Sequence, residues 1–213
     1  MPRTSTDHTR ERRKAMSEAF HSFHQPLTGL HCGLELALIK ANSHDEYRER
    51  VEDALARAGT VMELTQAIRE LAESTDPGER FGTVDLAPLL AQLVDELSSF
   101  AAEQADVRVL LTEMGPAYIS ADPAKLMRSL GNLIVPLIAR LHRGSAIEIR
   151  AMKQESDAVI VVEWKGSGRA QDGADTDSKA REIRCDAARS YIWTLGGEIA
   201  KGESRLEVRL PLA

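Results

Sequence analysis

The feature that most constrains the fold is a regular spacing of apolar residues near the N-terminus. These residues recur mostly at alternating intervals of four and three positions: Met16, Phe20, Phe23, Leu27, Leu30, Leu34, Leu38 and Ala41. Such spacing keeps a narrow apolar stripe along one side of a long helix and is typical of a coiled coil or helix bundle. We expect this helix to begin near Met16, after a polar N-terminus over residues 1–15 that is either frayed or a loosely held start of the helix.

The polar residues 42–46 interrupt this pattern and predict the start of a second helix. Ser43 and Glu46 have the spacing of a capping box, which satisfies free backbone N–H groups at a helix N-terminus. The second helix carries an apolar face formed by Val51, Ala54, Ala58, Val61, Ile68 and Ala72, flanked by Leu55, Met62 and Leu71. One antiparallel hairpin cannot cover its own apolar stripe. We therefore expect residues 16–73 to form a homodimer through a four-helix bundle.

A polar linker over residues 74–80, with adjacent Pro77 and Gly78, separates this hairpin from a second domain over residues 81–213. The pattern there predicts helix 86–104, strands 107–111 and 118–120, helix 123–141, strands 147–152 and 159–164, helix 179–195 and strand 206–210. Alternating apolar and polar residues in the strands indicate a sheet with helices on one face and solvent on the other. The fold class is α+β: a helical hairpin followed by an α/β sandwich.

Charge and composition exclude several functions. The formal net charge is −6, and neither helix of the hairpin carries clustered basic residues, so we expect no nucleic-acid partner. No apolar run is long enough to span a bilayer, and the N-terminus does not resemble a signal peptide. We expect a cytoplasmic protein without a membrane partner. The two cysteines, Cys32 and Cys185, lack a metal-binding or redox spacing, which predicts buried thiols and no metal site.

The first predicted helix carries His21, His24 and His31. His21 directly follows Phe20 of the apolar stripe, so we expect it at the edge of the stripe, exposed on a rigid support. Pro26 lies five residues further on, although proline removes a backbone donor and bends a helix. A strongly patterned helix that contains a proline needs an explanation.

The run His21-Ser22-Phe23-His24-Gln25-Pro26-Leu27-Thr28 resembles the H-box of bacterial two-component histidine kinases, which begins with histidine and ends in Pro-Leu-Thr. The resemblance extends from about Met16 to the C-terminus, because an ATPase-type domain follows the dimerising hairpin in that family. It implies that His21 is a phosphoacceptor whose imidazole holds a phosphoryl group as a phosphoramidate. It also implies response-regulator receiver domains as partners, and an upstream kinase as a further partner.

The run departs from the family pattern directly after the histidine. Family members usually have Asp or Glu there, which orients the imidazole and accepts its proton, whereas this chain has Ser22. A serine cannot serve as that base near neutral pH. Gln25 lies one helical turn beyond His21, where the resemblance implies a residue that positions water for dephosphorylation. His24 is a secondary candidate for the phosphoacceptor.

The nucleotide motifs of the family are also altered. Asn132 begins a sequence that resembles the N-box, but Pro136 replaces the asparagine that binds magnesium, and proline offers no side-chain oxygen. Trp164 occupies the place of the carboxylate that receives the adenine amino group in the first glycine-rich box. Gly166 and Gly168 of that box remain. We interpret Asn132, Gly166 and Gly168 as vestigial cofactor-binding residues.

The predicted lid and second glycine-rich box show further losses. No Phe lies between Gly168 and Gly196, although the family's lid carries one, and Glu182 and Arg184 replace the phosphate-binding glycines. A carboxylate at Glu182 would repel a triphosphate. We therefore expect that this chain binds no cofactor of its own, that it does not bind ATP productively, and that Mg²⁺ is supplied by the receiver domain.

These observations favour a histidine phosphotransferase that resembles a histidine kinase without ATP binding and relays phosphoryl groups through His21. Two alternatives stay open. One is an active sensor kinase with divergent nucleotide motifs, which measurable ATP affinity would favour. The other is a non-enzymatic pseudokinase that serves as a scaffold or inhibitor of its signalling partners.

Overall fold

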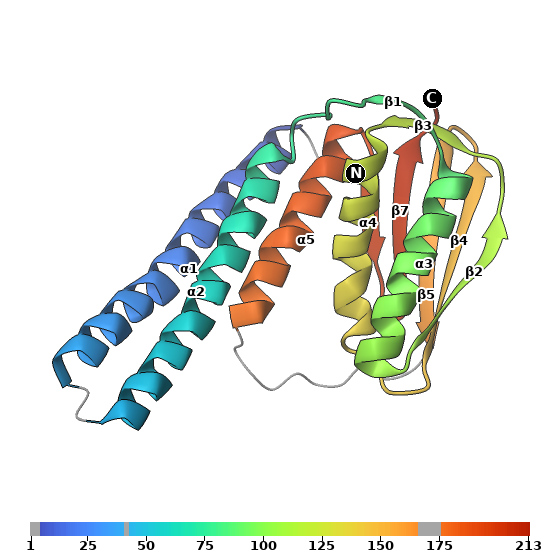
Figure 1. Ribbon diagram of the computed structural model, residues 1–213. Coiled ribbons are helices and arrows are strands. Elements are labelled where there is room, and N and C mark those ends of the chain that lie inside the picture. Colours follow the sequence, from blue (N-terminus) through green and yellow to red (C-terminus); the bar gives the residue numbers. More distant parts are fainter. Residues whose placement is uncertain (1–4, 41–42, 166–175) are drawn as a thin grey trace. The chain divides into compact units, whose positions relative to one another are not determined.

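The computed structural model describes residues 5–40, 43–165 and 176–213. The chain divides into two compact units, and α5 belongs to both (Figure 1). The first unit contains Met1–Glu73 and Ala174–Asp186, and the second contains Ser74–Gly173 and Ala187–Ala213. Within the described ranges, no helix is long and apolar enough to cross a membrane.

Two long helices form most of the first unit. α1 (Ser5–Lys40) and α2 (His44–Glu73) lie side by side and run in opposite directions (Figure 1). The backbone N–H of Glu46 donates to the Ser43 hydroxyl at 3.2 Å, as the predicted capping interaction requires. α1 begins at Ser5 rather than near Met16. Residues 10–14 are Arg, Glu, Arg, Arg and Lys, whose straight side chains favour helix.

The buried side of the helix pair differs in part from the predicted stripes. Ala19 and Ala37 are buried on α1, and Ala54, Leu64, Ala67 and Leu71 are buried on α2. The larger stripe residue Phe20 is 52% exposed, and Leu27, Leu34 and Val51 are exposed as well. Alanines are four of these six buried residues, and small residues allow two helices to approach closely, which leaves several larger apolar side chains exposed. Ala41 lies outside the described residues.

The second unit contains a five-stranded sheet in the order β2-β4-β5-β7-β6. Its strands are β2 (Arg108–Met114), β4 (Ala146–Gln154), β5 (Asp157–Lys165), β7 (Arg205–Pro211) and β6 (Glu198–Lys201). β2 pairs with β4 in parallel, and the other neighbours are antiparallel. β1 (Gly82–Asp85) and β3 (Tyr118–Ala121) form a separate two-stranded antiparallel sheet. The sequence predictions missed β1 and β6, which are short and gain their hydrogen bonds from strands elsewhere in the chain.

α3 (Leu86–Ala105) and α4 (Pro123–Ile138) cover one face of the five-stranded sheet (Figure 1). The side chains of Asp85 and Asp122 cap these helices by accepting backbone N–H groups of the first turn. The last part of α5 (Thr176–Thr194) adds to the same core through Ala188, Tyr191 and Ile192. The core also includes the buried residues Leu86, Leu90, Leu126, Leu130, Ile134, Ile147, Ile149, Ile160 and Val208.

The other face of the sheet carries charged side chains, which confirms the predicted alternation. Glu163 on β5 accepts hydrogen bonds from Arg150 on β4 at 3.0 Å and from Arg205 on β7 at 3.4 Å. Glu207 in turn accepts from Arg205 at 2.6 Å and from Arg209 at 2.7 Å. Although burial opposes ionisation of Glu207, the hydrogen bonds from Arg209 and Arg205 outweigh it and lower the pKa of that carboxyl.

Residues 74–80 belong to the second unit, and hydrogen bonds hold them to the rest of that unit. The Tyr191 hydroxyl donates to the Pro77 carbonyl at 3.2 Å and accepts the Asp122 N–H at 3.0 Å. The Asp122 carboxylate also accepts the Arg80 N–H at 3.0 Å. Gly78 has φ +106°, and a Cβ there would lie 2.5 Å from Asp122 Cβ, so this turn requires glycine. The segment predicted as a linker is therefore held in one conformation.

The Asp122 carboxylate is buried, and its environment favours the ionised form. Burial alone would raise its pKa, but backbone N–H groups of Arg80, Lys125 and Ala124 donate to it. These hydrogen bonds outweigh burial and lower the pKa of Asp122 below its ordinary value. The carboxylate therefore joins the segment 74–80 to the N-terminus of α4.

Candidate functional site

His21 lies on α1 with its side chain exposed, at the position expected beside the apolar stripe. Its neighbour Ala19 is fully buried, so the backbone that carries His21 is held against the rest of the unit. Pro26 lies within α1 and does not end the helix. Because proline has no N–H, the helix lacks the usual hydrogen bond to the carbonyl of Ser22, the residue after His21. The carbonyl that lacks its helical hydrogen bond therefore belongs to the residue directly after the candidate phosphoacceptor.

The hydroxyl of Ser22 donates to the backbone carbonyl of Glu18 at 2.8 Å. This bond directs Ser22 toward its own helix, so the residue does not replace an acidic group beside His21. Sequence reasoning did not consider Glu18, an exposed acidic residue one helical turn before His21. Its carboxylate lies 3.8 Å from the Lys14 ammonium. Helical spacing was the signal that could have identified it.

Gln25 and Thr28 are exposed and follow His21 by four and seven residues, which places all three on one face of α1. The Thr28 hydroxyl donates to the His24 carbonyl at 2.9 Å. The His24 imidazole and the Phe23 ring form an edge-on pair with centroids 6.4 Å apart. His21 and Gln25 are therefore exposed on the same face of α1, while the Ser22 hydroxyl is turned back toward the helix.

The residues that resemble the N-box lie on α4 in the second unit. Asn132 is half-buried and is engaged in an interaction of its own. Pro136 is half-buried near the C-terminal end of α4. It supplies no side-chain oxygen, so this position does not fit a magnesium ligand.

Trp164 lies on β5, at the position where the family places its adenine-binding carboxylate. Its indole is half-buried and packs against the hydrophobic core of the second unit. The adjacent carboxylate of Glu163 is paired with Arg150 and Arg205 on the charged face of the sheet. Glu163 therefore does not substitute for the missing group, in agreement with the alternation of side chains along a strand.

The remaining nucleotide positions are not assembled into one described site. Gly166, Gly168 and the segment that corresponds to the lid lie outside the described residues. Glu182 lies on the part of α5 that belongs to the first unit, where its carboxylate pairs with the Lys179 ammonium at 2.7 Å. Where the structure describes them, Pro136, Trp164 and Glu182 do not supply the groups that hold Mg-ATP in the family.

The fold, with its long paired helices and its helix-covered sheet, is that of the histidine kinases with their ATPase-type domain. A solved structure of the Acinetobacter baumannii histidine kinase AdeS superposes with a TM-score of 0.64, covering 90% of this chain and 98% of that chain at 17% identity. The structure of ShkA in complex with AMPPNP matches with a TM-score of 0.59, 17% identity and coverage of 94% and 46%. No protein-family model matches the chain.

Curated sensor proteins are similar to this chain in sequence. The sensor protein IrlS of Burkholderia pseudomallei is 30% identical over 154 residues, which are 71% of this chain and 32% of IrlS. The sensor-like histidine kinase SenX3 of Mycobacterium tuberculosis is 23% identical over 181 residues, or 84% of this chain and 44% of SenX3. The chain thus spans less than half the length of these relatives. It is a histidine-kinase-like protein whose relatives are sensor histidine kinases.

Proposed function

We propose that this chain is a two-component signalling protein that transfers phosphoryl groups to or from receiver-domain aspartates through His21, without using ATP. The proposal rests on the contrast between an exposed His21 and a packed Trp164. His21 is exposed on a helix that keeps the spacing of the phosphoacceptor motif, whereas Trp164 packs into the core where the family has its adenine-binding carboxylate. The relatives are sensor histidine kinases, which supports a role in two-component signalling.

In the proposed transfer, a nitrogen of the neutral His21 imidazole attacks the phosphorus of a receiver aspartyl phosphate. The P–N bond forms as the P–O bond breaks, and the aspartate leaves as a carboxylate; the reverse reaction restores the aspartyl phosphate. The task of this chain is to present the imidazole on a rigid helix, exposed and correctly oriented. The receiver domain provides Mg²⁺ and its acidic pocket. In this proposal Gln25, an exposed residue on the same face, orients water for hydrolysis of the phosphohistidine.

We also propose that the chain functions as a homodimer through α1 and α2. Phe20, Leu27 and Leu34 are exposed on α1 and recur every seven residues, while Leu55 and Met62 are 73% and 72% exposed on α2. A contiguous set of large exposed apolar side chains marks an interface. A second copy of the helix pair would cover these side chains in a four-helix bundle.

The test incubates the full chain and Mg²⁺ with one of two labelled donors. One donor is γ-labelled ATP, and the other is a receiver domain phosphorylated by labelled acetyl phosphate and then freed of it. We expect label to pass from the phosphorylated receiver to the wild-type chain and none to come directly from ATP. His21→Ala should reduce the transfer to background, because it removes the nucleophile. His24→Ala is the matched control and should keep the transfer, because His24 is an exposed histidine on the same helix.

The second candidate is an ATP-dependent sensor kinase. The 30% identity to the sensor protein IrlS and the likeness to ShkA, which was solved with AMPPNP, favour this alternative. Label taken directly from ATP by the wild-type chain and lost in His21→Ala would establish it and contradict the ATP-independent proposal. Transfer from neither donor, after cognate receivers have been tested, would favour a non-enzymatic scaffold or inhibitor.

A further inference from the structure

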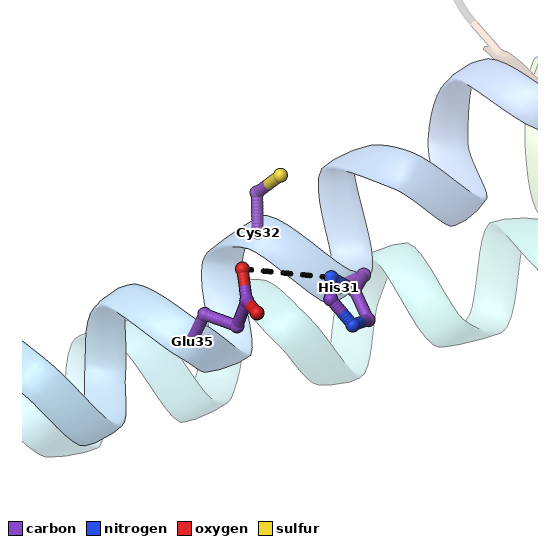
Figure 2. A group of neighbouring side chains, drawn as sticks. All are labelled: His31, Cys32 and Glu35. Atoms are coloured by element: carbon purple, nitrogen blue, oxygen red, sulfur yellow. Dashed lines mark ion pairs between the residues drawn. The ribbon is translucent and has the colours of Figure 1, made fainter.

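A group of three potential metal ligands lies on α1, away from the residues of the proposed phosphotransfer. His31, Cys32 and Glu35 are all exposed, and one ligand atom from each lies within 4.8 Å of the others (Figure 2). His31 Nδ1 and Glu35 Oε2 are 3.6 Å apart, as the dashed line in Figure 2 shows. The exposure of Cys32 corrects the expectation of a buried thiol. An exposed position on a helix surface gives this sulfur access to solvent ions.

The distances suit a tetrahedral ion without a change in the backbone. Bond lengths of about 2.0–2.3 Å place two ligands of tetrahedral Zn²⁺ roughly 3.3–3.7 Å apart. The separation of His31 Nδ1 and Glu35 Oε2, 3.6 Å, already falls in this range. The ligand atoms of all three residues lie within 4.8 Å of one another, and rotation about the exposed side-chain bond of Cys32 can bring its thiol to bonding distance of the ion. Residues four apart on a helix face the same side, which explains the His31–Glu35 pairing.

The donor set selects the kind of ion. Thiolate, imidazole and carboxylate together are ligands of Zn²⁺, whereas Mg²⁺ and Ca²⁺ prefer oxygen atoms alone. Three protein ligands leave a fourth position for water. We propose that His31, Cys32 and Glu35 bind Zn²⁺, with the Cys32 thiol releasing its proton to solvent as the Zn–S bond forms. The two negative ligands balance the charge of the ion.

This site does not depend on the proposed function, because none of its ligands takes part in the transfer through His21. The sequence predicted no metal site, since the ligands do not follow a paired-cysteine spacing. The helix supplies the proximity instead: Cys32 and Glu35 are three residues apart, and His31 and Glu35 are four apart.

The test is a titration of the reduced full-length chain with Co²⁺, followed by displacement with Zn²⁺. Co²⁺ is a spectroscopic substitute for Zn²⁺ that gives a sulfur-to-metal charge-transfer band when a thiolate is bound. We expect one ion per chain, one proton released from the thiol, and loss of the band in Cys32→Ser. His31→Ala and Glu35→Gln should each weaken binding about tenfold or more, since changes in the outer shell alone typically cost about that much.

Two variants serve as matched controls. Cys185→Ser keeps Cys32, and His24→Ala removes a histidine that lies seven residues before His31. Both variants should bind Co²⁺ as the wild type does. Circular dichroism verifies that each variant keeps its helices. The proposal is overturned if the wild type shows no saturable binding, if the band persists in Cys32→Ser, if it disappears in Cys185→Ser, or if one ion binds per two chains.

Discussion

The first and second units of this chain bury their apolar residues in different ways. In the second unit, large side chains such as Leu86, Leu130 and Ile138 are no more than 1% exposed, and they form one core between the helices and the sheet. In the first unit, several buried positions on α1 and α2 are alanines, while Leu55 and Met62 are more than 70% exposed. One unit buries its large apolar side chains in a core of its own, and the other leaves several of them exposed on its helices.

The same contrast extends to the residues with chemical function. The first unit exposes His21 and Gln25, together with the ligand group at His31, Cys32 and Glu35. In the second unit, Trp164 at a nucleotide position of the family has become part of the packing. Reactive side chains need solvent access, whereas a side chain that fills a core contributes to stability. The contrast therefore favours chemistry on the helices and a structural or docking role for the sheet.

The largest predicted effect tests the closed core of the second unit. Leu130→Ala should lower the free energy of unfolding by about 3 kcal/mol, because it leaves a cavity at a site that is 1% exposed. Urea unfolding followed by tryptophan fluorescence measures this unit selectively, since Trp164 and Trp193 both lie in it. Leu55→Ala, at a position 73% exposed on α2, should change the same transition by less than about 0.5 kcal/mol. Equal effects of the two variants would contradict the comparison.

The next prediction concerns the exposed apolar side chains on the helices of the first unit. Sedimentation at micromolar concentration should show a dimer for the wild type, and Leu55→Glu combined with Met62→Glu should weaken dimerisation at least tenfold, because charged groups would have to be buried. Leu110→Glu, at an exposed leucine on β2, is the control and should leave the dimer intact. A monomeric wild type would refute the four-helix bundle.

A smaller loss of stability is expected when the hydrogen bonds that hold residues 74–80 to the rest of the second unit are removed. Tyr191→Phe removes the hydroxyl that donates to Pro77 and accepts from the buried N–H of Asp122. Leaving these groups unpaired should cost about 1–2 kcal/mol in the fluorescence-detected transition. Tyr118→Phe, at a tyrosine 49% exposed, should cost less than about 0.5 kcal/mol. Faster amide exchange at Arg80 in Tyr191→Phe alone would show that the segment had loosened.

The smallest effect is a pH dependence of the second unit. The pKa of Asp122 is lower in the folded state than the ordinary value near 3.9 that we assume for the unfolded chain, so the unfolded chain binds more protons near pH 4. This contribution to stability is present above about pH 5 and is lost as the pH falls through the folded-state pKa. Asp122→Asn should therefore show a shallower loss of stability in acid than the wild type. An equal slope in both proteins would exclude Asp122 as a source, and the exposed Asp95→Asn serves as the control.

Much of the secondary structure was predictable because local patterns specify it. The helix at 86–104 and the strand at 206–210 were each found within one residue of their observed bounds, since apolar periodicity distinguishes helix from strand. β1 and β6 were missed because each has only four residues and no clear alternation. Their hydrogen bonds come from β3 and β7, and pairing between separate segments is not encoded in a local pattern.

The candidate site was predictable to the extent that one helix contains it. The exposure of His21 and its alignment with Gln25 follow from helical spacing, and the structure agrees with that expectation. The exposure of Cys32 was not foreseen, because composition suggested only a typical buried thiol. The roles of Glu163 and Trp164 depended on which face of β5 each side chain occupies, and therefore on the sheet.

The sequence by itself determined the paired helices, the α+β character of the chain and the histidine-kinase-like motif around His21, because each depends on residues a few positions apart. Only the tertiary structure decided how the segment 74–80 is held, since Tyr191 and Asp122 reach it from far along the chain. It also decided which apolar side chains are covered and which remain exposed on α1 and α2. The physical reason is that burial and long-range hydrogen bonds depend on which segments meet in space, and local periodicity does not specify those meetings.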